Sequence, residues 1–200
     1  MNKVKNCWGH PFYQFCRNSV IVVSRIFFRL HVIGLEKVPH TGSLIVCCNH
    51  IHNFDPPVLG SVIPRYVHFM TKSELFKVKV VSRLLLVIGA FPVNRGGQDK
   101  SAIKYALSVP KSGECLVIFP EGHRSKGGKL GQGQPGVAFI ARKSGSPVVP
   151  AAIIGPYRLF GRLTIRFGNL IQVNEKDTNE QVLDTLMTAI KKLVDEGHSK

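Results

Sequence analysis

The stretch LIVCCNHIHNFDPP, residues 44–57, decides how this sequence is interpreted. It opens with an apolar run and continues with polar residues, which is typical of a buried strand that ends in a loop. His50 and Asp55 in the polar part are five residues apart, and five helical steps separate two side chains by about 140°. The two side chains therefore meet only across a turn. We predict a strand that ends near Cys48, a tight loop, and a helix entered at Asp55 with Pro56 in its first turn.

His50 and Asp55, brought together by such a turn, make a candidate general base. An imidazole titrates near neutral pH, and a carboxylate that accepts its second N–H fixes the tautomer and stabilises the imidazolium. The base can then take a proton from a hydroxyl group that attacks a carbonyl carbon. Two structural interpretations stay open, because an aspartate before proline is often a helix cap and a histidine after a strand is often a hydrogen-bonded loop residue.

A metal site is a further interpretation of the same residues. Alternate side chains of an extended segment point to one side, so His50 and His52 can share a metal ion with Asp55, as in zinc or di-metal hydrolases. Such sites usually need more ligands, and the remaining histidines stand singly: His10, His31, His40, His68, His123 and His198. A metal-dependent hydrolase that uses these three residues is the alternative from a different functional class.

The length and the alternation of segments predict one α/β domain. Two hundred residues suffice for one well-buried core and are too few for two ordinary domains. Short apolar runs alternate with amphipathic segments, so we expect a central, mostly parallel or mixed sheet flanked by helices and preceded by an amphipathic N-terminal helix. Strands are expected at 31–35, 44–48, 66–70, 115–119, 148–154 and 163–167. Helices are expected at 56–63, 73–88, 98–109, 136–144 and 179–196.

Charge and cysteine usage limit the partners and the compartment. The formal net charge is +15, and residues 176–200 are the exception with four basic and five acidic side chains. Such a field attracts nucleic acid, anionic lipid headgroups or phosphorylated carriers, and charge alone does not choose among them. The five cysteines form no C-x-x-C pair and their number is odd, which is typical of reduced thiols in the cytosol.

The amino-terminal segment favours lipid among these partners. Arg17, Arg25 and Arg29 interrupt it, so no uncharged apolar run reaches the roughly 18 residues of a spanning helix. On a helical wheel the polar side chains share one sector, and six apolar ones lie outside it: Phe12, Phe15, Val22, Val23, Ile26 and Phe27. We expect residues 1–30 to be an amphipathic membrane-association helix on an anionic surface. The alternative is a helix that faces the core.

Two further polar passages follow apolar segments, where an α/β sheet tends to present its ligand site. GAFPVNRGG, residues 89–97, contains Arg95, and FPEGHRS, residues 119–125, contains Glu121 and Arg124. Guanidinium groups make directed, charge-assisted contacts with phosphate oxygens, so both arginines are candidate phosphate ligands. Glu121 is a candidate acceptor for a substrate hydroxyl or a support for one arginine. Each passage taken alone is equally well a surface turn.

Four blocks in order resemble the glycerolipid acyltransferase family, and in particular its 1-acyl-sn-glycerol-3-phosphate (lysophosphatidate) acyltransferases. They are N-H-x-x-x-x-D at 49–55, G-x-F-x-x-x-R at 89–95, F-P-E-G-x-R-S at 119–125 and V-V-P at 148–150. The resemblance covers about residues 45–155. It implies an acyltransferase domain over 31–200 and an enzyme that moves a fatty acyl group from acyl-CoA or acyl-carrier protein to the sn-2 hydroxyl of 1-acylglycerol-3-phosphate, giving phosphatidic acid in phospholipid biosynthesis.

The resemblance also implies roles for particular residues. His50 is implied as the general base and Asp55 as its orienting partner. Four residues are implied to bind the phosphate end of the acceptor: Arg95, Glu121, Gly122 and Arg124. No metal, no cofactor and no nucleic acid are implied. The expected partners are lysophosphatidate, an acyl thioester and an anionic membrane surface, and the expected location is the cell membrane, peripheral or monotopic on its cytoplasmic face.

Two points limit this picture. Cys47 and Cys48 lie next to the block with His50 and raise a covalent-nucleophile interpretation, but adjacent strand positions face opposite sides, so at most one can point at the site. His123 stands where many family members have threonine, and Gln132 and Gln134 stand where lysines are common. A related acyltransferase for another lysolipid acceptor is therefore an open alternative.

Overall fold

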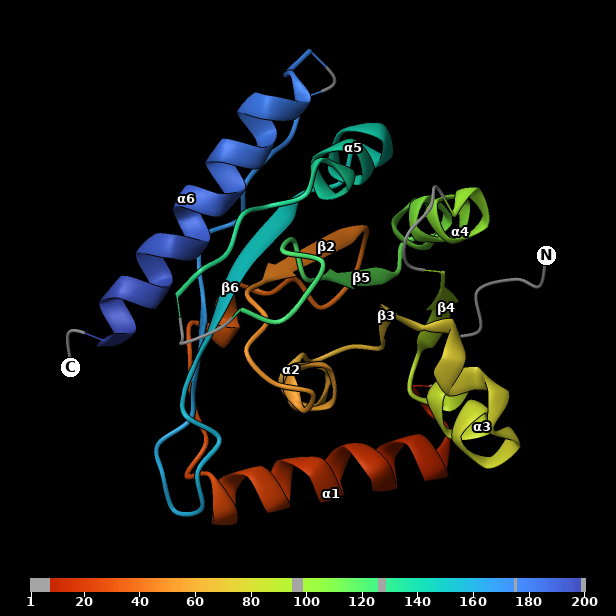
Figure 1. Cartoon of the computed structure of the whole chain (residues 1–200), viewed down its shortest axis with the longest axis vertical. Helices are drawn as coiled ribbons and strands as arrows, with labels where there is room; N and C mark the ends of the chain where they lie inside the picture. The colour runs from red at the N-terminus through yellow and green to blue at the C-terminus, as the bar shows by residue number, and fades with distance from the viewer. Residues whose placement is uncertain (1–7, 95–98, 126–128, 175, 199–200) are drawn as a thin grey trace.

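A central sheet carries helices on both of its faces (Figure 1). The structure is a computed structural model that describes residues 8–94, 99–125, 129–174 and 176–198. The strands in this part are β1 (His31–Ile33), β2 (Leu44–Cys48), β3 (Val67–Lys72), β4 (Ala90–Val93), β5 (Cys115–Ile118), β6 (Val148–Ile154) and β7 (Thr164–Phe167). The α-helices are α1 (Pro11–Phe27), α2 (Asp55–Val62), α3 (Lys79–Val87), α4 (Lys100–Lys111), α5 (Pro135–Ser144) and α6 (Asn179–His198), with 3-10 helices η1 (Leu35–Lys37) and η2 (Ser73–Lys77).

The sheet is mixed and has the order β1-β7-β6-β2-β5-β3-β4. β2 pairs in parallel with β5 and β6, and the parallel set continues from β5 through β3 to β4. β7 runs antiparallel to β6 and pairs in parallel with β1 at the edge. The predicted α/β domain with a mostly parallel or mixed sheet is confirmed.

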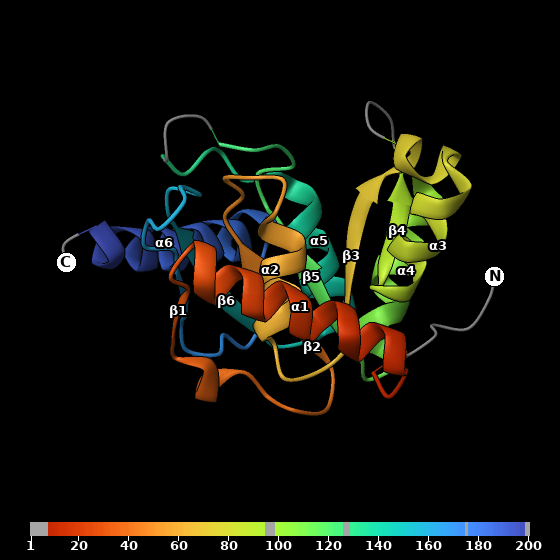
Figure 2. The same cartoon turned by 90° about the horizontal axis from the view of Figure 1, so that it is seen from below.

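The apolar run of β2 is continuous because helices cover both faces of the sheet, and all five residues of the strand are buried. Ile45 and Cys47 pack in the apolar cluster under α4, α5 and α6. Leu44, Val46 and Cys48 pack in the opposite cluster, which includes residues of α2. α1 lies on the outer side of α2, and α3 lies beside β4 (Figures 1 and 2).

Two elements differ from the prediction. β4 is not predicted because it is a four-residue edge strand and contains Pro92, which cannot donate to a sheet ladder. The helix expected at 73–88 is divided into η2 and α3, since Phe76 packs against the core and the chain is extended at Val78 before α3 begins. The N-terminal helix expected over 1–30 is present as α1, Pro11–Phe27, and residues 1–7 lie outside the described residues. The other expected strands and helices lie within two residues of their predicted ends.

α1 turns its apolar sector away from the domain. Tyr13 and Ser24 are buried, and Val20 packs against the core cluster beneath the helix. The six apolar side chains grouped by the helical wheel are exposed: Phe12, Phe15, Val22, Val23, Ile26 and Phe27. They do not face the core. Among the helices of the described residues, none has the length and hydropathy that a bilayer-spanning segment needs.

Exposed large apolar side chains gather on one side of the sheet. Besides the six of α1, those in the described ranges are Ile33, Phe54, Leu75, Val78, Val80, Val81, Leu84, Leu86, Leu159 and Phe160. None of this described set belongs to α4, α5 or α6. We call α1, α2 and α3 the α1–α3 layer, and α4, α5 and α6 the α4–α6 layer.

Candidate active site

The candidate site lies at the carboxyl-terminal ends of the central strands. His50 comes two residues after β2, Glu121 three residues after β5, and Tyr157 three residues after β6. β2 is parallel to both of its neighbours β5 and β6, so the carboxyl-terminal ends of the three strands lie side by side. This is where open α/β sheets present their ligand sites.

His50 and Asp55 form a close hydrogen-bonded pair. The distance from His50 Nδ1 to Asp55 Oδ2 is 2.7 Å. The Asp55 side chain is wholly buried, whereas the His50 side chain is 13% exposed. Because Nδ1 is engaged by the carboxylate, the ring nitrogen left for a substrate is Nε2. The predicted convergence of an imidazole and a carboxylate is present.

Main-chain geometry explains why five residues bring the pair together. Asp55 is the first residue of α2, and its N–H donates to the His52 carbonyl at 3.1 Å. The N–H groups of Ile51 and His52 both donate to Asp55 Oδ2, at 2.6 and 2.7 Å. Pro56 lies in the first helical turn, where a missing N–H costs nothing. The predicted strand, turn and helix therefore form as expected.

The turn after β5 holds His50 from the other side. The His50 N–H donates to Glu121 Oε1 at 2.9 Å. The His50 carbonyl accepts from the Ser125 N–H at 2.7 Å and from its hydroxyl at 3.0 Å. The imidazole stacks on the Phe119 ring with centroids 4.4 Å apart. These contacts fix the main chain and the ring of His50 together.

Glu121 is enclosed by main-chain donors. Its side chain is fully buried, and Oε2 accepts from the Gly131 N–H at 2.6 Å. A Cβ at position 131 would lie 2.6 Å from that oxygen, so any other residue there would displace the Glu121 carboxylate. Gly122 and Arg124 are exposed in the same turn, and Gly122 has a φ of 69°. The turn thus presents Gly122 and Arg124 outward while Glu121 points inward.

Arg95 lies outside the described residues. The described residues on either side of it, Asn94 and Asp99, are joined by a hydrogen bond of 2.9 Å from the Asn94 N–H to Asp99 Oδ2. Asp99 also accepts from Ser101 and Ala102 and so caps α4. The Ser101 hydroxyl and these N–H groups lower the pKa of Asp99 to about 2.

Tyr157 is a site residue that no sequence motif indicates. Its hydroxyl donates to Asp55 Oδ1 at 2.8 Å, and its ring stacks on His52 at 4.5 Å. Burial, and then the neighbouring Asp55 carboxylate, raise the pKa of Tyr157 well above its usual value. The phenol therefore stays a donor. The available signal was its place shortly after the strand at 148–154, the same relation that His50 has to β2.

The metal and covalent alternatives find little support in the geometry. Within the ranges that the structure describes, no group of three or more His, Cys, Asp or Glu side chains is placed to hold a metal ion. His52 Nδ1 accepts from the Phe54 N–H at 3.3 Å. Burial raises the pKa of Cys47 to about 12 and that of Cys48 well above its usual value. A buried thiol of this kind carries almost no thiolate at neutral pH.

A comparison with protein families adds to this geometry, since the model described as Acyltransferase matches residues 29–154. The matched segment contains His50, Asp55 and Glu121 and covers more than half of the chain. The chain belongs to the acyltransferase family. The resemblance stated from the four blocks is confirmed.

Curated relatives of this acyltransferase carry a more specific name. It is 35% identical over 148 residues to the 1-acyl-sn-glycerol-3-phosphate acyltransferase of Bacillus subtilis, with 72% of each chain covered. It is 30% identical over 190 residues to the protein of the same name from Streptococcus pneumoniae, covering 90% of this chain and 70% of that one. The crystal structure of the 1-acyl-sn-glycerophosphate (LPA) acyltransferase PlsC from Thermotoga maritima has the same fold, with a TM-score of 0.80, 23% identity, and 94% and 80% of the two chains covered.

An apolar groove of about 420 Å³ lies beside α2, the helix that begins at Asp55, in this acyltransferase. Side chains from α1, α2, β3 and α3 line it, among them Val20, Pro56, Pro57 and Leu84. Pro56 and Pro57 directly follow Asp55 in α2, although neither His50 nor Asp55 lines the groove.

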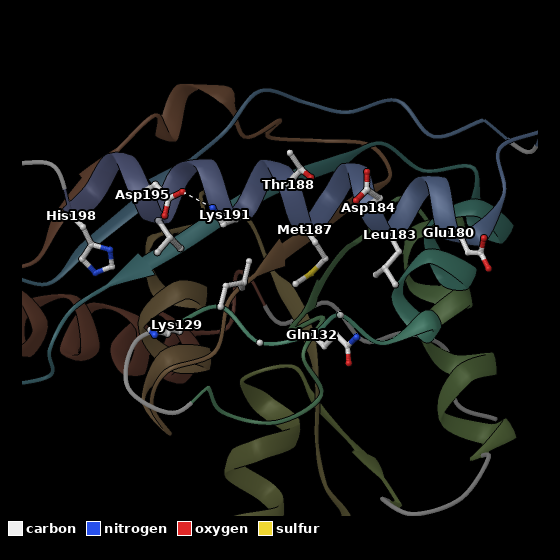
Figure 3. A pocket seen from close by; sticks show the side chains of 14 residues that line it. Lys129, Gln132, Glu180, Leu183, Asp184, Met187, Thr188, Lys191, Asp195 and His198 are labelled. Atoms are coloured by element: carbon white, nitrogen blue, oxygen red, sulfur yellow. Dashed lines mark hydrogen bonds and ion pairs between the residues drawn. The ribbon is translucent and has the colours of Figure 1, made fainter.

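A second hollow, of about 730 Å³, lies between α6 and residues 129–133 (Figure 3). Leu183 and Met187 point from α6 toward this segment, and a Cβ at Gly133 would come within 2.8 Å of both side chains. Lys191 and Asp195 form an ion pair at 3.1 Å on its rim. Neither His50 nor Asp55 lines it, so this hollow is separate from the pair, although the segment that borders it also holds Glu121 through Gly131.

Proposed function

We propose that this acyltransferase moves a fatty acyl group from an acyl thioester to the sn-2 hydroxyl of 1-acylglycerol-3-phosphate, giving phosphatidic acid in phospholipid biosynthesis. The observation that carries the proposal is the 2.7 Å contact between His50 Nδ1 and a fully buried Asp55 carboxylate. The names of the relatives from Bacillus subtilis and Streptococcus pneumoniae support the choice of acceptor.

The proposed reaction needs one base and no covalent enzyme intermediate. His50 Nε2 takes the proton of the sn-2 hydroxyl while the oxygen attacks the thioester carbonyl. A C–O bond forms, the C–S bond breaks, and the imidazolium returns the proton to the leaving thiolate. Asp55 keeps the imidazole in the tautomer whose free nitrogen is Nε2 and stabilises the imidazolium. The buried thiols of Cys47 and Cys48 have no step in this scheme.

Two residues are proposed to act by positioning this base. Tyr157 donates to Asp55 Oδ1, while Oδ2 accepts from Ile51, His52 and the imidazole. The carboxylate therefore has little freedom to rotate. Glu121 accepts the N–H of His50 and that of Gly131. We propose that Glu121 supports acceptor binding indirectly, by keeping its turn against the His50 main chain.

The phosphate end of the acceptor is proposed to lie over the turn after β5. Arg124 is exposed there, and the next residue, Ser125, is bonded to the His50 carbonyl. A guanidinium at this place can bind phosphate oxygens while the neighbouring hydroxyl faces His50. Gly122 adds an exposed turn without a side chain. Arg95 is proposed as a second phosphate ligand on the basis of the family resemblance alone.

The apolar groove beside α2 is proposed to receive an acyl chain. The surface that α1, α2, β3 and α3 expose to it is almost wholly apolar, although Arg17, Ser19 and Ser61 are among the lining residues. An acyl chain is the apolar part of both substrates. The donor is proposed to be acyl-CoA or acyl-carrier protein. The net charge of +15 suits either, since both carry anionic groups.

Residues 1–30 are proposed as the membrane-association segment and residues 31–200 as the catalytic domain. The six outward apolar side chains of α1 support this division, because a helix with its apolar sector in solvent suits the headgroup boundary of a bilayer. The proposed location is the cytoplasmic face of the cell membrane, with peripheral or monotopic attachment.

A thiol-release assay tests the reaction. We expect purified protein to release thiol from acyl-CoA or acyl-carrier protein when lysophosphatidate is present, and to prefer it over lysolipids with other headgroups. His50→Ala should lose roughly 10²- to 10⁴-fold in turnover. His198→Ala, an exposed histidine of α6, is the matched control and should not change it. Unchanged turnover in the His50→Ala protein refutes the base assignment.

A further inference from the structure

The loop between β6 and β7 presents an apolar tip flanked by two arginines. Leu159 and Phe160 are 58% and 62% exposed, and Arg158 and Arg162 are exposed on either side. Phe160 has a φ of 58°, in the left-handed region. A large side chain is uncommon there, and such strain persists where the surrounding structure imposes it. The backbone therefore holds the tip of the loop in solvent.

Main-chain hydrogen bonds join this loop to the end of α1. The Phe160 N–H donates to the Phe27 carbonyl at 2.6 Å, and the Leu163 N–H donates to the Phe28 carbonyl at 2.9 Å. Figure 1 shows the loop beside the last turn of α1, at the lower left of the view. Ile26 and Phe27 in that turn are exposed. The loop tip and the end of the helix thus form one apolar edge.

The same loop begins in the candidate active site. Tyr157 lies two residues before Leu159 and donates to Asp55 Oδ1 at 2.8 Å. Its ring also meets the Phe28 ring edge-on, with centroids 5.4 Å apart. The position of the loop and that of the Asp55 carboxylate are therefore linked by one side chain.

We propose that the tip of this loop is a second membrane contact, which inserts Leu159 and Phe160 into an anionic bilayer beside the end of α1. Apolar side chains enter the acyl boundary while neighbouring guanidinium groups bind lipid phosphates. Charge complementarity points to anionic lipid as the partner, because the overall charge is +15 and four exposed arginines belong to the loop, to the last turn of α1 or to the residues just after it. They are Arg25, Arg29, Arg158 and Arg162.

This inference deepens the membrane association proposed above and rests on it. It adds a second point of attachment, so that the molecule has a defined orientation on the bilayer. It also predicts an effect on turnover, because the loop whose tip contacts the membrane also carries Tyr157. We expect acceptor molecules within a bilayer to depend on the tip, and acceptor molecules in solution not to.

A tryptophan at the tip tests the contact directly. Trp8 is the single tryptophan of the chain, so Phe160→Trp in a Trp8→Phe background reports on the loop alone. Adding vesicles of phosphatidylglycerol and phosphatidylcholine should shift its emission to the blue, and brominated acyl chains should quench it. Thr188→Trp on α6, in the same background, should show neither effect. An unshifted emission from the Phe160→Trp protein overturns the proposal.

Phe160→Asn separates membrane contact from packing. Asparagine tolerates the left-handed conformation better than phenylalanine, so the melting temperature should stay equal or rise. Loss of the aromatic side chain should weaken sedimentation with anionic vesicles by roughly tenfold. A variant that melts at a lower temperature and sediments as well as the wild type would mean that Phe160 serves packing, which overturns the proposal.

Paired charge variants test whether the arginines act locally. Arg158→Gln with Arg162→Gln removes two positive charges at the loop, and Lys104→Gln with Lys143→Gln removes two exposed charges from α4 and α5. We expect the loop pair to lower vesicle affinity by roughly tenfold and the control pair by less than about twofold. Equal losses would attribute binding to net charge and reject a local contact.

The outcome for the loop can be told apart from the outcome for the reaction. A short-chain, water-soluble lysophosphatidate tests thiol release without a membrane, and Phe160→Asn should match the wild type there. With acceptor in vesicles the same variant should be roughly tenfold slower, in line with its weaker binding. No thiol release from the wild type would defeat the proposed reaction, while the fluorescence result would still decide the loop.

Discussion

The two helical layers use the same kind of sequence pattern in opposite ways. In α6 of the α4–α6 layer, the apolar positions Leu186 and Ile190 are completely buried against the sheet. In α1 of the α1–α3 layer, the apolar position Phe15 is 68% exposed, and the buried positions include Ser24. An amphipathic pattern therefore identifies a two-faced helix but not which face meets the protein. The neighbouring surface decides that.

The largest expected effect is the difference in stability loss between two truncations to alanine, one in each layer. Leu186→Ala removes a fully buried side chain and should lower the free energy of unfolding by about 4 kcal/mol. Phe15→Ala removes a larger side chain and should change it by less than about 0.5 kcal/mol, because the residue is mostly exposed. Urea unfolding measures both. Comparable losses in the two variants would break the contrast between the layers.

The next effect concerns a buried histidine on the α4 side of the sheet. His68 in β3 lies near Tyr105 of α4, and its buried Nε2 has no hydrogen-bond partner among the residues that the structure describes. Burial lowers the pKa of His68 from 6.5 to about 4. His68 therefore binds a proton below pH 6.5 in the unfolded chain, whereas in the folded protein it stays neutral until about pH 4. Folding stability should fall by up to about 3 kcal/mol as the pH decreases through this window.

Unfolding measured between pH 7 and pH 4 tests the assignment. His68→Leu should flatten the decrease in stability, because it removes the group that titrates. His31→Leu is the control, since His31 is exposed and should leave the pH dependence unchanged. An equally steep decrease in the His68→Leu protein would show that other groups cause it.

A smaller effect should follow from loosening the link between the α1–α3 layer and the site. Tyr157→Phe removes the donor to Asp55 Oδ1 and leaves a buried oxygen without this partner, which costs about 1 to 3 kcal/mol. We expect kcat to fall roughly tenfold while KM for the acceptor changes little, because Tyr157 acts on the base and not on substrate binding. A change confined to KM would place Tyr157 in the acceptor site instead.

The smallest effect should be found on the outer side of the α4–α6 layer. Lys191 and Asp195 form an exposed i,i+4 ion pair on α6. Exposed pairs of this kind contribute little, so Lys191→Ala should change the free energy of unfolding by less than about 0.5 kcal/mol. Thermal unfolding at low and high salt measures it. A loss above about 1 kcal/mol would show that this exposed face of α6 contributes to folding, which would contradict the contrast with its buried face.

The fold and the centre of the site were predictable where local chemistry decides the structure. The apolar run 44–48, the turn and Pro56 fix β2, the loop and α2 with few alternatives. β4 was missed because a short edge strand with Pro92 carries almost no local signal. Tyr157 was missed because its contact with Asp55 spans 102 residues of sequence. Contacts of that kind arise only when strand order places β6 beside β2.

The outward apolar face of α1 was the expectation from the sequence, but the pattern alone left the alternative of a core-facing helix open. Its periodicity defines two sectors, and the contact of Tyr13 and Val20 with the domain, which selects the buried one, is set by tertiary packing. Arg95 lies outside the described residues, so its predicted role in phosphate binding stays a prediction. The role of Arg124 also stays a prediction, although its turn is held against His50.

The enclosure of Glu121 sets a polarity requirement at that position. Both carboxylate oxygens face main-chain N–H groups, one from His50 and one from Gly131. Glutamine has the same shape but replaces one oxygen with an NH₂ group, which would confront one of these N–H groups donor to donor. Isosteric replacement is thus excluded by hydrogen-bond direction rather than by size. A glutamate at position 121 is thus explained by the need for two hydrogen-bond acceptors, independently of any interaction between its charge and a ligand.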